Sequence, residues 1–417
     1  MNKIRLGIIG LGSRGYSMLK GNFIHFDEID FTAMCDTYED RVTRAQEFVK
    51  ENRGNTPFGT TDYSELLARD DVDAVYVSTA WEWHIEISIA AMKAGKAVAM
   101  EVGGSYSIDE CFALVKTYEE TKTPFLFMEN CCFNRAELLA ASMAKAGAFG
   151  TIVHCMGSYS HDLREEITHG NIKRHYRLRN YMKHNCDNYP THDLGPIARI
   201  LGINRGNRML SLVSVASKAA GLREYINARP ELVSEDPTLA TAEFSQGDVV
   251  TTIIKCAGGE TITLRLDTTL PRSYTRDFTV RGTRGMYEMN ANYVFLDGME
   301  ESWVPADHYA KEVNNAKKYE AEYLPDVWYN MTEEDKKRGH GGMDYILFRE
   351  FIKALQNNTE MPIDVYDAAS WMCISALSEA SIALGGAPQS IPDFTNGKWI
   401  VRENKPVIEL AHRKVEN

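Results

Sequence analysis

The sequence predicts an α/β protein of two parts: a doubly wound parallel sheet over residues 1–130, and an α/β domain with a large, mainly antiparallel open sheet over residues 131–417. Through about residue 130, short apolar runs alternate with amphipathic stretches of helical period. From about residue 150, strand-like segments follow one another across tight turns. The C-terminal segment of the second range is also a candidate for packing back on the first domain.

The strands expected in the first part are five apolar runs separated by helical stretches. Alternation of strand and helix at this spacing predicts parallel strands with helices on both faces of the sheet. The runs are IRLGIIG (4–10), FTAMCD (31–36), AVYVST (74–79), AVAMEV (97–102) and PFLFMEN (124–130).

The second part shows strand candidates joined by turns such as QGD, AGG and GTRG, which predicts mainly antiparallel pairing. These candidates are residues 151–162, 208–217, 240–257, 259–269 and 276–289. Helical patterns cover residues 166–200, 343–357 and 366–385, and the last is apolar almost all round, which predicts a buried helix. The polar stretch 300–340 is expected to be a long surface excursion.

Composition narrows the classes of partner. The chain has 417 residues, 44% hydrophobic and 25% charged, with a net charge of −12 that argues against nucleic acid or an anionic membrane as the main partner. Eight cysteines without a CxxC pair predict reduced core thiols and no zinc site. The N-terminus runs directly into a strand and no long apolar segment follows, so we expect a cytoplasmic protein; a trimmed exported precursor is the alternative.

The strongest local signal is a dinucleotide motif. GLGSRG places Gly10, Gly12 and Gly15 in G-x-G-x-x-G spacing after a strand, with Ser13 and Arg14 between them. A second strand ends in Asp36, which suits the adenosine ribose hydroxyls and repels a 2′-phosphate. This combination predicts a Rossmann domain that binds NAD in preference to NADP.

Further cofactor contacts are expected where other strands of this sheet end, because ligands bind at the carboxyl edge of such sheets. Trp81 and His84 follow one strand, Glu101 ends the next near the nicotinamide, and Asn130 closes the one after that. The role of Trp83 is left open, since two tryptophans at a turn also suit a hydrophobic plug between domains.

Several longer motifs resemble a known family. With GLGSRG, CD at 35–36 and ME at 100–101, the chain is similar to the Gfo/Idh/MocA oxidoreductases, in which a Rossmann domain is paired with an open sheet domain and the nicotinamide and sugar meet between them. More narrowly, the chain resembles glycoside hydrolase family 109, the NAD-dependent α-N-acetylgalactosaminidases, in the following stretches: TAWEWH, GSYSHDLR, NYPTHDLGP, LPRSYTR, HGGMD, DVYDAASW and IPDFTNGKW. The resemblance covers nearly the whole chain and implies a homo-oligomer through the exposed face of the second sheet.

Two departures from the dehydrogenases of that superfamily suggest the reaction. Where they carry Glu-Lys-Pro, this chain has Glu101, Val102 and Gly103, and where they carry the aspartate of Asp-x-x-x-His, it has Asn188. The resemblance therefore implies an NAD-dependent glycosidase, not net oxidation of an alcohol. In that reaction C3 of the sugar is oxidised, the C2 proton is removed, the C1 substituent is eliminated, water adds, and C3 is reduced again.

The resemblance also assigns the catalytic groups. Tyr159 is expected to be the C2 base, with its pKa lowered by nearby His or Arg charge, and His161 is expected to tune it. His192 is expected near the C3 hydroxyl or the nicotinamide as an acid–base or orienting group. The residues expected to contact the sugar are Glu129, Arg177, Tyr189 and Tyr274.

Alternatives remain for these residues and for the activity. Tyr159 also suits a half-buried strand, and Arg177 alone would be a solvated charge. His161 and His192 lie beside acids, but no HxH or HExxH spacing is present, so we expect no metal. The rival functions are an ordinary NAD-dependent sugar or inositol dehydrogenase and a non-catalytic protein that binds NAD and sugar.

Overall fold

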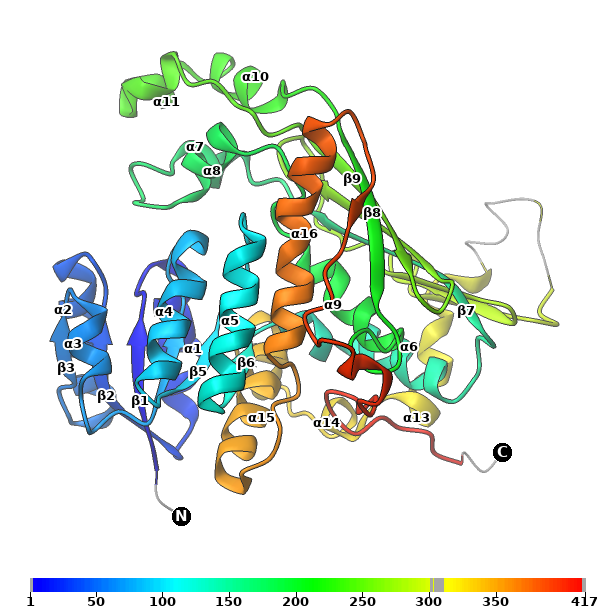
Figure 1. Ribbon diagram of the computed structural model, residues 1–417, viewed down its shortest axis with the longest axis horizontal. Helices are drawn as coiled ribbons and strands as arrows, with labels where there is room; N and C mark the ends of the chain where they lie inside the picture. The colour runs from blue at the N-terminus through cyan, green and yellow to red at the C-terminus, as the bar shows by residue number, and fades with distance from the viewer. Residues whose placement is uncertain (1–2, 301–302, 304–310, 415–417) are drawn as a thin grey trace. The chain divides into compact units, whose positions relative to one another are not determined.

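The computed structural model describes residues 3–300, 303 and 311–414 (Figure 1). The chain forms two compact units. The first combines Met1–Asn130 with Met331–Ala369, and the second combines Cys131–Asn330 with Ser370–Asn417. The segment 331–369, which the sequence analysis placed within the range 131–417, thus groups with residues 1–130.

The first unit is built on a six-stranded parallel sheet in the order β3-β2-β1-β4-β5-β6, which confirms the predicted doubly wound sheet. The chain order reverses between β1 and β4, and a ligand site is expected at the carboxyl ends of the strands there. The strands are β1 Ile4–Ile9, β2 Ile29–Cys35, β3 Phe58–Thr60, β4 Ala74–Val77, β5 Ala97–Met100 and β6 Phe125–Phe127.

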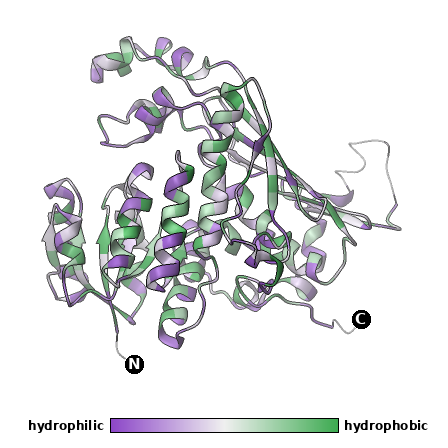
Figure 2. Ribbon diagram, in the orientation of Figure 1, coloured by the Kyte–Doolittle hydropathy of each residue, from purple (hydrophilic) through white to green (hydrophobic). Residues whose placement is uncertain are grey.

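The helices of this unit alternate with the strands, and their sequences specify where several of them begin and end. The Ser107 and Asp62 side chains cap α5 and α3 by accepting backbone N–H groups, and Gly54 ends α2 in the left-handed conformation. Both green and purple residues occur along these helices in Figure 2, as amphipathic helices require. The helices are α1 Ser13–Gly21, α2 Glu39–Arg53, α3 Tyr63–Leu67, α4 Trp81–Lys93, α5 Ile108–Thr121 and α15 Met343–Asn357.

The second unit is built on an eight-stranded sheet in the order β13-β12-β11-β7-β10-β9-β8-β14. Among the pairings that the described residues of this sheet form, β7–β10 alone is parallel, which confirms the mainly antiparallel sheet. The strands are β7 Ile152–Ser160, β8 Met209–Ala216, β9 Val249–Cys256, β10 Thr261–Asp267, β11 Thr279–Gly282, β12 Gly285–Glu288, β13 Tyr293–Leu296 and β14 Gln389–Ser390.

One face of this sheet is covered and the other is open. Along β9, Val250, Thr252 and Ile254 are buried, whereas Ile253 between them is 52% exposed. The helix α9 packs against β7 so closely that a Cβ on Gly157 would lie 2.7 Å from the Cβ of Asp193. The helices here are α6 Arg135–Lys145, α9 Thr191–Ile200, α10 Gly221–Asn227, α11 Pro230–Glu235 and most of α16 Val365–Ala383, whose residues are largely buried as predicted.

Three expectations about local structure need correction. The helical pattern over 166–200 forms three helices, α7 Arg164–Thr168, α8 Arg177–Lys183 and α9, because left-handed Arg174 and then Pro190 interrupt it. No strand begins at residue 240: the helix η3 Pro237–Ala240 and a loop precede β9.

The stretch 300–340 is described only in part, since residues 301–302 and 304–310 lie outside the described residues. Its described portion carries short helices and buries Ala316, Leu324 and Trp328, so it is more than a surface excursion. These helices are η4 Asn315–Tyr319, α13 Glu320–Tyr323, α14 Asp326–Tyr329 and η5 Asp335–Lys337; the remaining short helices of the chain are η1 Phe23–His25, η2 Asn130–Phe133, η6 His340–Gly342 and η7 Lys398–Ile400.

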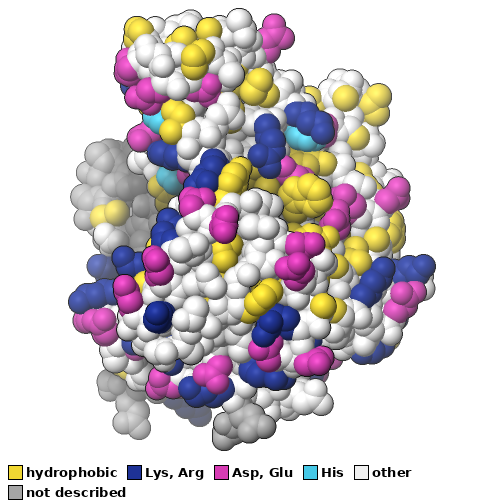
Figure 3. All heavy atoms as spheres, turned by 90° about the vertical axis from the view of Figure 1, so that its left-hand side faces the viewer, with side chains coloured by type: hydrophobic (Ala, Val, Ile, Leu, Met, Phe, Trp, Pro, Cys, Tyr) yellow, Lys and Arg dark blue, Asp and Glu magenta, His cyan; other side chains and the backbone are white. Residues whose placement is uncertain are grey.

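Other global expectations can be compared directly with the structure. All eight cysteines are buried thiols, as predicted. None of the helices within the described ranges has the length and apolar character that a bilayer span requires. On the face drawn in Figure 3, side chains of both charges are interspersed.

Candidate functional site

The glycine-rich turn between β1 and α1 has the geometry that close approach of a pyrophosphate needs. Gly10 has φ +96°, and a Cβ there would lie 2.5 Å from the Ser78 carbonyl oxygen. A Cβ on Gly15 would lie 1.9 Å from the Gly10 carbonyl oxygen, so only glycine fits. A Cβ on Gly12 would meet only the Arg41 side chain, at 3.4 Å, so no backbone crowds this position at the N-terminus of α1, where phosphates bind in such turns.

Asp36 lies at the end of β2 and is tied to this turn. Its Oδ2 accepts the Leu11 N–H at 2.7 Å and its Oδ1 accepts the Tyr38 N–H at 3.0 Å. Each carboxylate oxygen has further acceptor capacity for a ribose hydroxyl. Arg41, which the sequence analysis did not single out, lies 3.5 Å from the same carboxylate. These residues fit the adenosine half of NAD.

The residues after β4 divide into buried and exposed groups. His84 is 2% exposed, and its Nε2 lies 3.1 Å from the Thr79 carbonyl oxygen. Burial lowers the pKa of His84, which favours the neutral imidazole. Trp81 is buried against Gly103, whereas Trp83 is 47% exposed. Cofactor contact by Trp81 and His84 stays a prediction.

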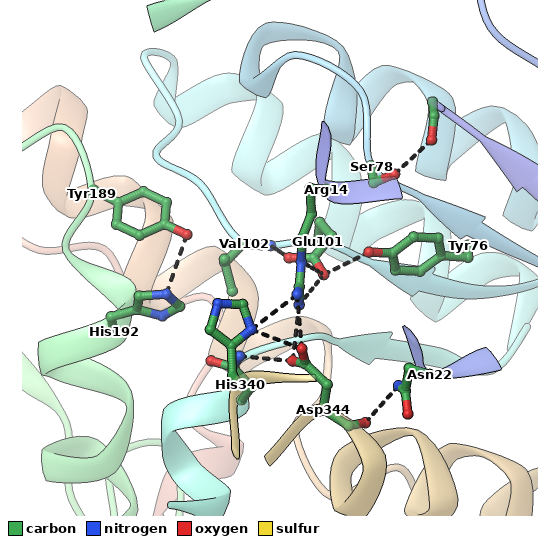
Figure 4. Close-up of polar contacts among 12 residues, drawn as sticks. Arg14, Asn22, Tyr76, Ser78, Glu101, Val102, Tyr189, His192, His340 and Asp344 are labelled. Atoms are coloured by element: carbon green, nitrogen blue, oxygen red, sulfur yellow. Dashed lines mark hydrogen bonds and ion pairs between the residues drawn. The ribbon is translucent and has the colours of Figure 1, made fainter. Parts of the chain in front are cut away.

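An ionic cluster around the buried acids Glu101 and Asp344 joins three of the predicted cofactor residues to α15, and Figure 4 shows its contacts among Arg14, Glu101 and Asp344. Arg14 Nε donates to Glu101 Oε1 at 2.9 Å, and its two terminal nitrogens lie 2.8 and 2.9 Å from the two oxygens of Asp344. Asn130 Nδ2 donates to Asp344 Oδ1 at 2.7 Å. Arg14 therefore contacts two carboxylates that lie more than 200 residues apart in the sequence.

Two further residues complete this cluster. Tyr76 donates its hydroxyl to Glu101 Oε1 at 2.7 Å, and His340 Nδ1 lies 2.8 Å from Asp344 Oδ2. Burial alone would raise the pKa of Asp344, but the charge and hydrogen bonds of Arg14, with His340, hold it far below its usual range. Asp344 is the last residue of the HGGMD motif and was not predicted as a site residue. Its sequence neighbourhood gives no signal of a partner, Arg14, that lies 330 residues away.

In the second unit, the end of β7 and the start of α9 bring three predicted residues together. The ring of Tyr159 lies 4.6 Å from that of Tyr189 and 5.7 Å from that of His192, centroid to centroid. The Tyr189 hydroxyl lies 3.3 Å from His192 Nε2 (Figure 4). The Tyr-Pro-Thr-His spacing does this because Pro190 starts α9 and turns both side chains to one side.

Two more predicted residues extend this aromatic group. The His161 ring lies 6.1 Å from Tyr159 and 5.2 Å from Tyr274, both edge to face. Burial lowers the pKa of His161, so a neutral ring is favoured next to Tyr159. Tyr274 is half exposed at its loop position.

Arg177 is buried beside these aromatics and is not the solvated charge that composition alone suggests. It is 8% exposed, its guanidinium lies 5.3 Å from the Tyr189 ring centroid, and its Nε lies 2.7 Å from Glu166 Oε1. Glu166, which sequence reasoning missed, keeps this charge in place. Its signal was weak, because an acid on a short polar segment is typical of an exposed helix.

The expected lowering of the Tyr159 pKa is wrong for the protein without substrate. Burial raises the pKa of Tyr159 well above its ordinary value, and the Arg177 charge only opposes that effect. His161 adds no positive charge in its favoured neutral state. The expectation considered only the charges near Tyr159, whereas burial has the larger effect on its pKa.

A second buried pair supports Tyr274. Arg276 donates to Glu137 Oε1 through Nε at 2.9 Å and through a terminal nitrogen at 2.5 Å, and both side chains are nearly inaccessible. The other Arg276 nitrogen donates to the Tyr274 hydroxyl at 3.0 Å. Neither residue was predicted, because each alone looks like a surface charge.

Two predicted positions are placed without a decided role. Glu129 is fully buried after β6, at the end of the first range of unit one, and its contact with sugar stays a prediction. Asn188 is buried and donates to Gln246 Oε1 at 3.0 Å. An amide there makes a neutral hydrogen bond where the related dehydrogenases would have a carboxylate.

Comparisons with known proteins match both units. A family model described as "Glycosyl hydrolase 109, C-terminal domain" matches residues 133–401, and one described as "Oxidoreductase family, NAD-binding Rossmann fold" matches residues 4–128. The first unit is thus an NAD-binding Rossmann domain. A glycosyl hydrolase family 109 protein of Solibacter usitatus is 36% identical over 407 residues, covering 96% of this chain and 90% of that protein.

An alpha-N-acetylgalactosaminidase of Tannerella forsythia is 35% identical, with 96% of this chain and 88% of that protein covered. Among solved structures, levoglucosan dehydrogenase in complex with NADH and levoglucosan matches with a TM-score of 0.66 at 17% identity, covering 94% of this chain and 100% of that one. Myo-inositol 2-dehydrogenase from Lactobacillus plantarum matches with a TM-score of 0.65 at 14% identity and the same coverage. These structures share the fold, and the sequence relatives with the matching family model show that the chain belongs to glycosyl hydrolase family 109.

Proposed function

We propose that this chain is an NAD-dependent glycosidase acting on N-acetylhexosaminides such as α-N-acetylgalactosaminides, by transient oxidation at C3 and elimination across C1 and C2. The observation that carries the proposal is that the second unit groups buried Tyr159, Tyr189 and Arg177 with partly exposed His192, in a chain with Val102 in place of the dehydrogenase lysine. The family and the relatives' names support the same reaction class.

Bound NAD⁺ supplies the hydride acceptor for C3 of the sugar and the hydride that restores it. The Rossmann unit fits this cofactor: no backbone crowds Gly12 at the N-terminus of α1, and Asp36 retains acceptor capacity for ribose hydroxyls. Every other step falls to side chains that hold or move protons.

Tyr159 Oη is proposed to take the C2 proton once C3 is a ketone. The burial that raises the Tyr159 pKa makes its phenolate a stronger base, and the Arg177 charge keeps that form accessible. A strong base is needed at this step because the C3 ketone makes the C2 proton only moderately acidic. Tyr159 then returns a proton to C2 when water adds.

His192 is proposed to hold the proton of the C3 hydroxyl. Its Nε2 faces the Tyr189 hydroxyl at 3.3 Å, which fixes the ring orientation. Proton transfer at C3 thus uses an imidazole on α9 in this chain, and the position that carries lysine in the related dehydrogenases is apolar.

The remaining predicted contacts are proposed to orient the sugar. Arg177 donates to sugar hydroxyls or the acetamido oxygen, Tyr274 packs on a sugar face, and Glu129 accepts from a hydroxyl. The Arg276 hydrogen bond to the Tyr274 hydroxyl leaves that hydroxyl's own proton to donate to substrate.

The open face of the second sheet is proposed to form a homo-oligomer contact. Val215 and Ile253 are 55% and 52% exposed on adjacent strands of this face. Light scattering after gel filtration tests this, and a monomer at micromolar concentration contradicts it.

The rival dehydrogenase reading has the fold of the solved structures on its side, but a fold hosts many functions. A panel of p-nitrophenyl glycosides, including α- and β-N-acetylgalactosaminides, separates the readings when nitrophenol and NADH are followed together. Nitrophenol release without net NADH supports the glycosidase, and NADH in proportion to free sugar supports the dehydrogenase. Cofactor and sugar binding without turnover supports a non-catalytic protein that binds NAD and sugar.

Variants sharpen this assay. Tyr159→Phe is expected to abolish release, whereas Tyr287→Phe is a matched control, because Tyr287 is a buried tyrosine on β12 of the same sheet. Equal activity in both variants would remove Tyr159 from the mechanism.

A further inference from the structure

The ionic cluster around Arg14 is not balanced in charge. One guanidinium meets two carboxylates, Glu101 and Asp344, at 2.8 Å each, so these three groups together carry one net negative charge. Both acids are nearly inaccessible, at 4% and 0% exposure. An excess charge buried in this way acts through a medium that screens it less than water does.

The hydrogen bonds of the cluster come mainly from donor groups. Glu101 accepts from Arg14, from the Tyr76 hydroxyl and from the Val102 N–H, all of which are donors to a carboxylate. Asp344 accepts from Arg14 through both oxygens. Donors stabilise the ionised form of a carboxylate, and the charge and hydrogen bonds of Arg14 hold the pKa of Asp344 far below its usual range.

The cluster occupies a defined place in the Rossmann unit. Asp36, at the end of β2, marks the side of the adenosine half, and the chain order reverses between β1 and β4. The nicotinamide half of a dinucleotide therefore belongs beyond the reversal, at the carboxyl ends of β4 and β5. Glu101 directly follows β5, so the net negative charge lies on the nicotinamide side of this sheet edge.

We infer that Glu101 and Asp344 bias the bound nicotinamide toward its oxidised form. The oxidised ring carries a positive charge and the reduced ring carries none, so a fixed negative charge nearby stabilises only the former. At an effective dielectric constant of about 20, one charge within about 10 Å of the ring changes the ratio of NAD⁺ affinity to NADH affinity about tenfold or more. Asp344 also positions Arg14, and the positive charge of Arg14 offsets one of the two carboxylate charges.

This inference rests on the proposed function, which begins and ends each turnover with the oxidised cofactor. A bias toward that form favours return of the hydride to C3 and opposes loss of the oxidised sugar with the cofactor left reduced. An ordinary dehydrogenase, which hands its hydride on as free NADH, has no need of such a bias.

The test compares the dissociation constants of NAD⁺ and NADH for the full chain. NADH binding is measured by its fluorescence, and NAD⁺ binding by competition with it, for the wild type, Asp344→Asn and Glu101→Gln. In each variant, we expect the ratio of the NAD⁺ constant to the NADH constant to rise about tenfold or more. Asp73→Asn is the matched control: Asp73 also pairs with an arginine, Arg5, but just before β4, at the opposite sheet edge, and its ratio should not change.

The inference would be overturned by a ratio of dissociation constants that is unchanged in both variants, including the case in which the affinities for NAD⁺ and NADH fall equally. If Asp344→Asn does not fold, Glu101→Gln, which keeps an acceptor for Tyr76, decides alone. The ratio is independent of glycoside cleavage. A chain that fails to cleave the glycosides but shows the shifted ratio would refute the proposed function and retain the inference.

Discussion

Replacing Glu137 with glutamine should destabilise the second unit far more than an ordinary surface change. Glu137 and Arg276 are 2% and 6% exposed, and two nitrogens of the arginine donate to one glutamate oxygen. Removing one partner of a buried pair leaves the other charge uncompensated, which costs about 3–5 kcal/mol. For a unit of this size we expect the melting temperature to fall by about 10 °C.

A double-mutant cycle shows whether burial is the cause. Replacing both residues with apolar side chains of similar volume, as in Glu137→Leu with Arg276→Met, leaves no buried charge behind. The double variant should therefore be more stable than either single one, as measured by urea unfolding. A cost below about 1 kcal/mol for Glu137→Gln, typical of an exposed pair, would refute this reasoning. Strictly additive single changes would refute it as well.

Other predictions concern the cofactor turn, the catalytic base and acid stability. Gly15→Ala should abolish NAD binding in a titration, because its Cβ would lie 1.9 Å from the Gly10 carbonyl oxygen; Gly21→Ala, with nothing within 4 Å, should bind normally. Arg177→Met should raise the Tyr159 pKa further, and since the base acts unprotonated, the rising limb of kcat/KM should move to higher pH; an unmoved limb would exclude Tyr159 as that base. The pKa of Asp344 is depressed in the folded chain, so its contribution to the free energy of unfolding is complete above its unfolded pKa of about 4. The difference in free energy of unfolding between wild type and Asp344→Asn should therefore shrink as the pH falls below that value. A difference that stays constant from pH 7 to pH 3 would contradict this.

The fold was predictable because it depends on patterns that are local in the sequence. Alternating periods specified the parallel sheet, and turns between strands specified the antiparallel one. The failures are also local. The single helical pattern over 166–200 contains Arg174 in a left-handed conformation and a proline that starts a new helix, and neither interrupts the apolar periodicity strongly.

The candidate site was predictable only in its chemistry-bearing residues. Tyr159, Tyr189 and His192 came from motifs, and the structure brings them together. The residues that hold such groups in place were missed, since Glu166 and Arg276 look like solvated charges until their burial partners are known. Long-range pairing, such as that of Arg14 with α15, leaves no periodic trace in one sequence.

The central claim is that the C2 proton of the sugar is removed and replaced in each turnover, and one measurement tests it directly. The chain is incubated with a cleavable N-acetylhexosaminide in D₂O, and the released sugar is analysed by NMR and mass spectrometry. Elimination and water addition predict one deuterium at C2 of the product, with no net NADH formed. Product that retains its original C2 proton would contradict the account, because direct displacement at C1 leaves C2 untouched.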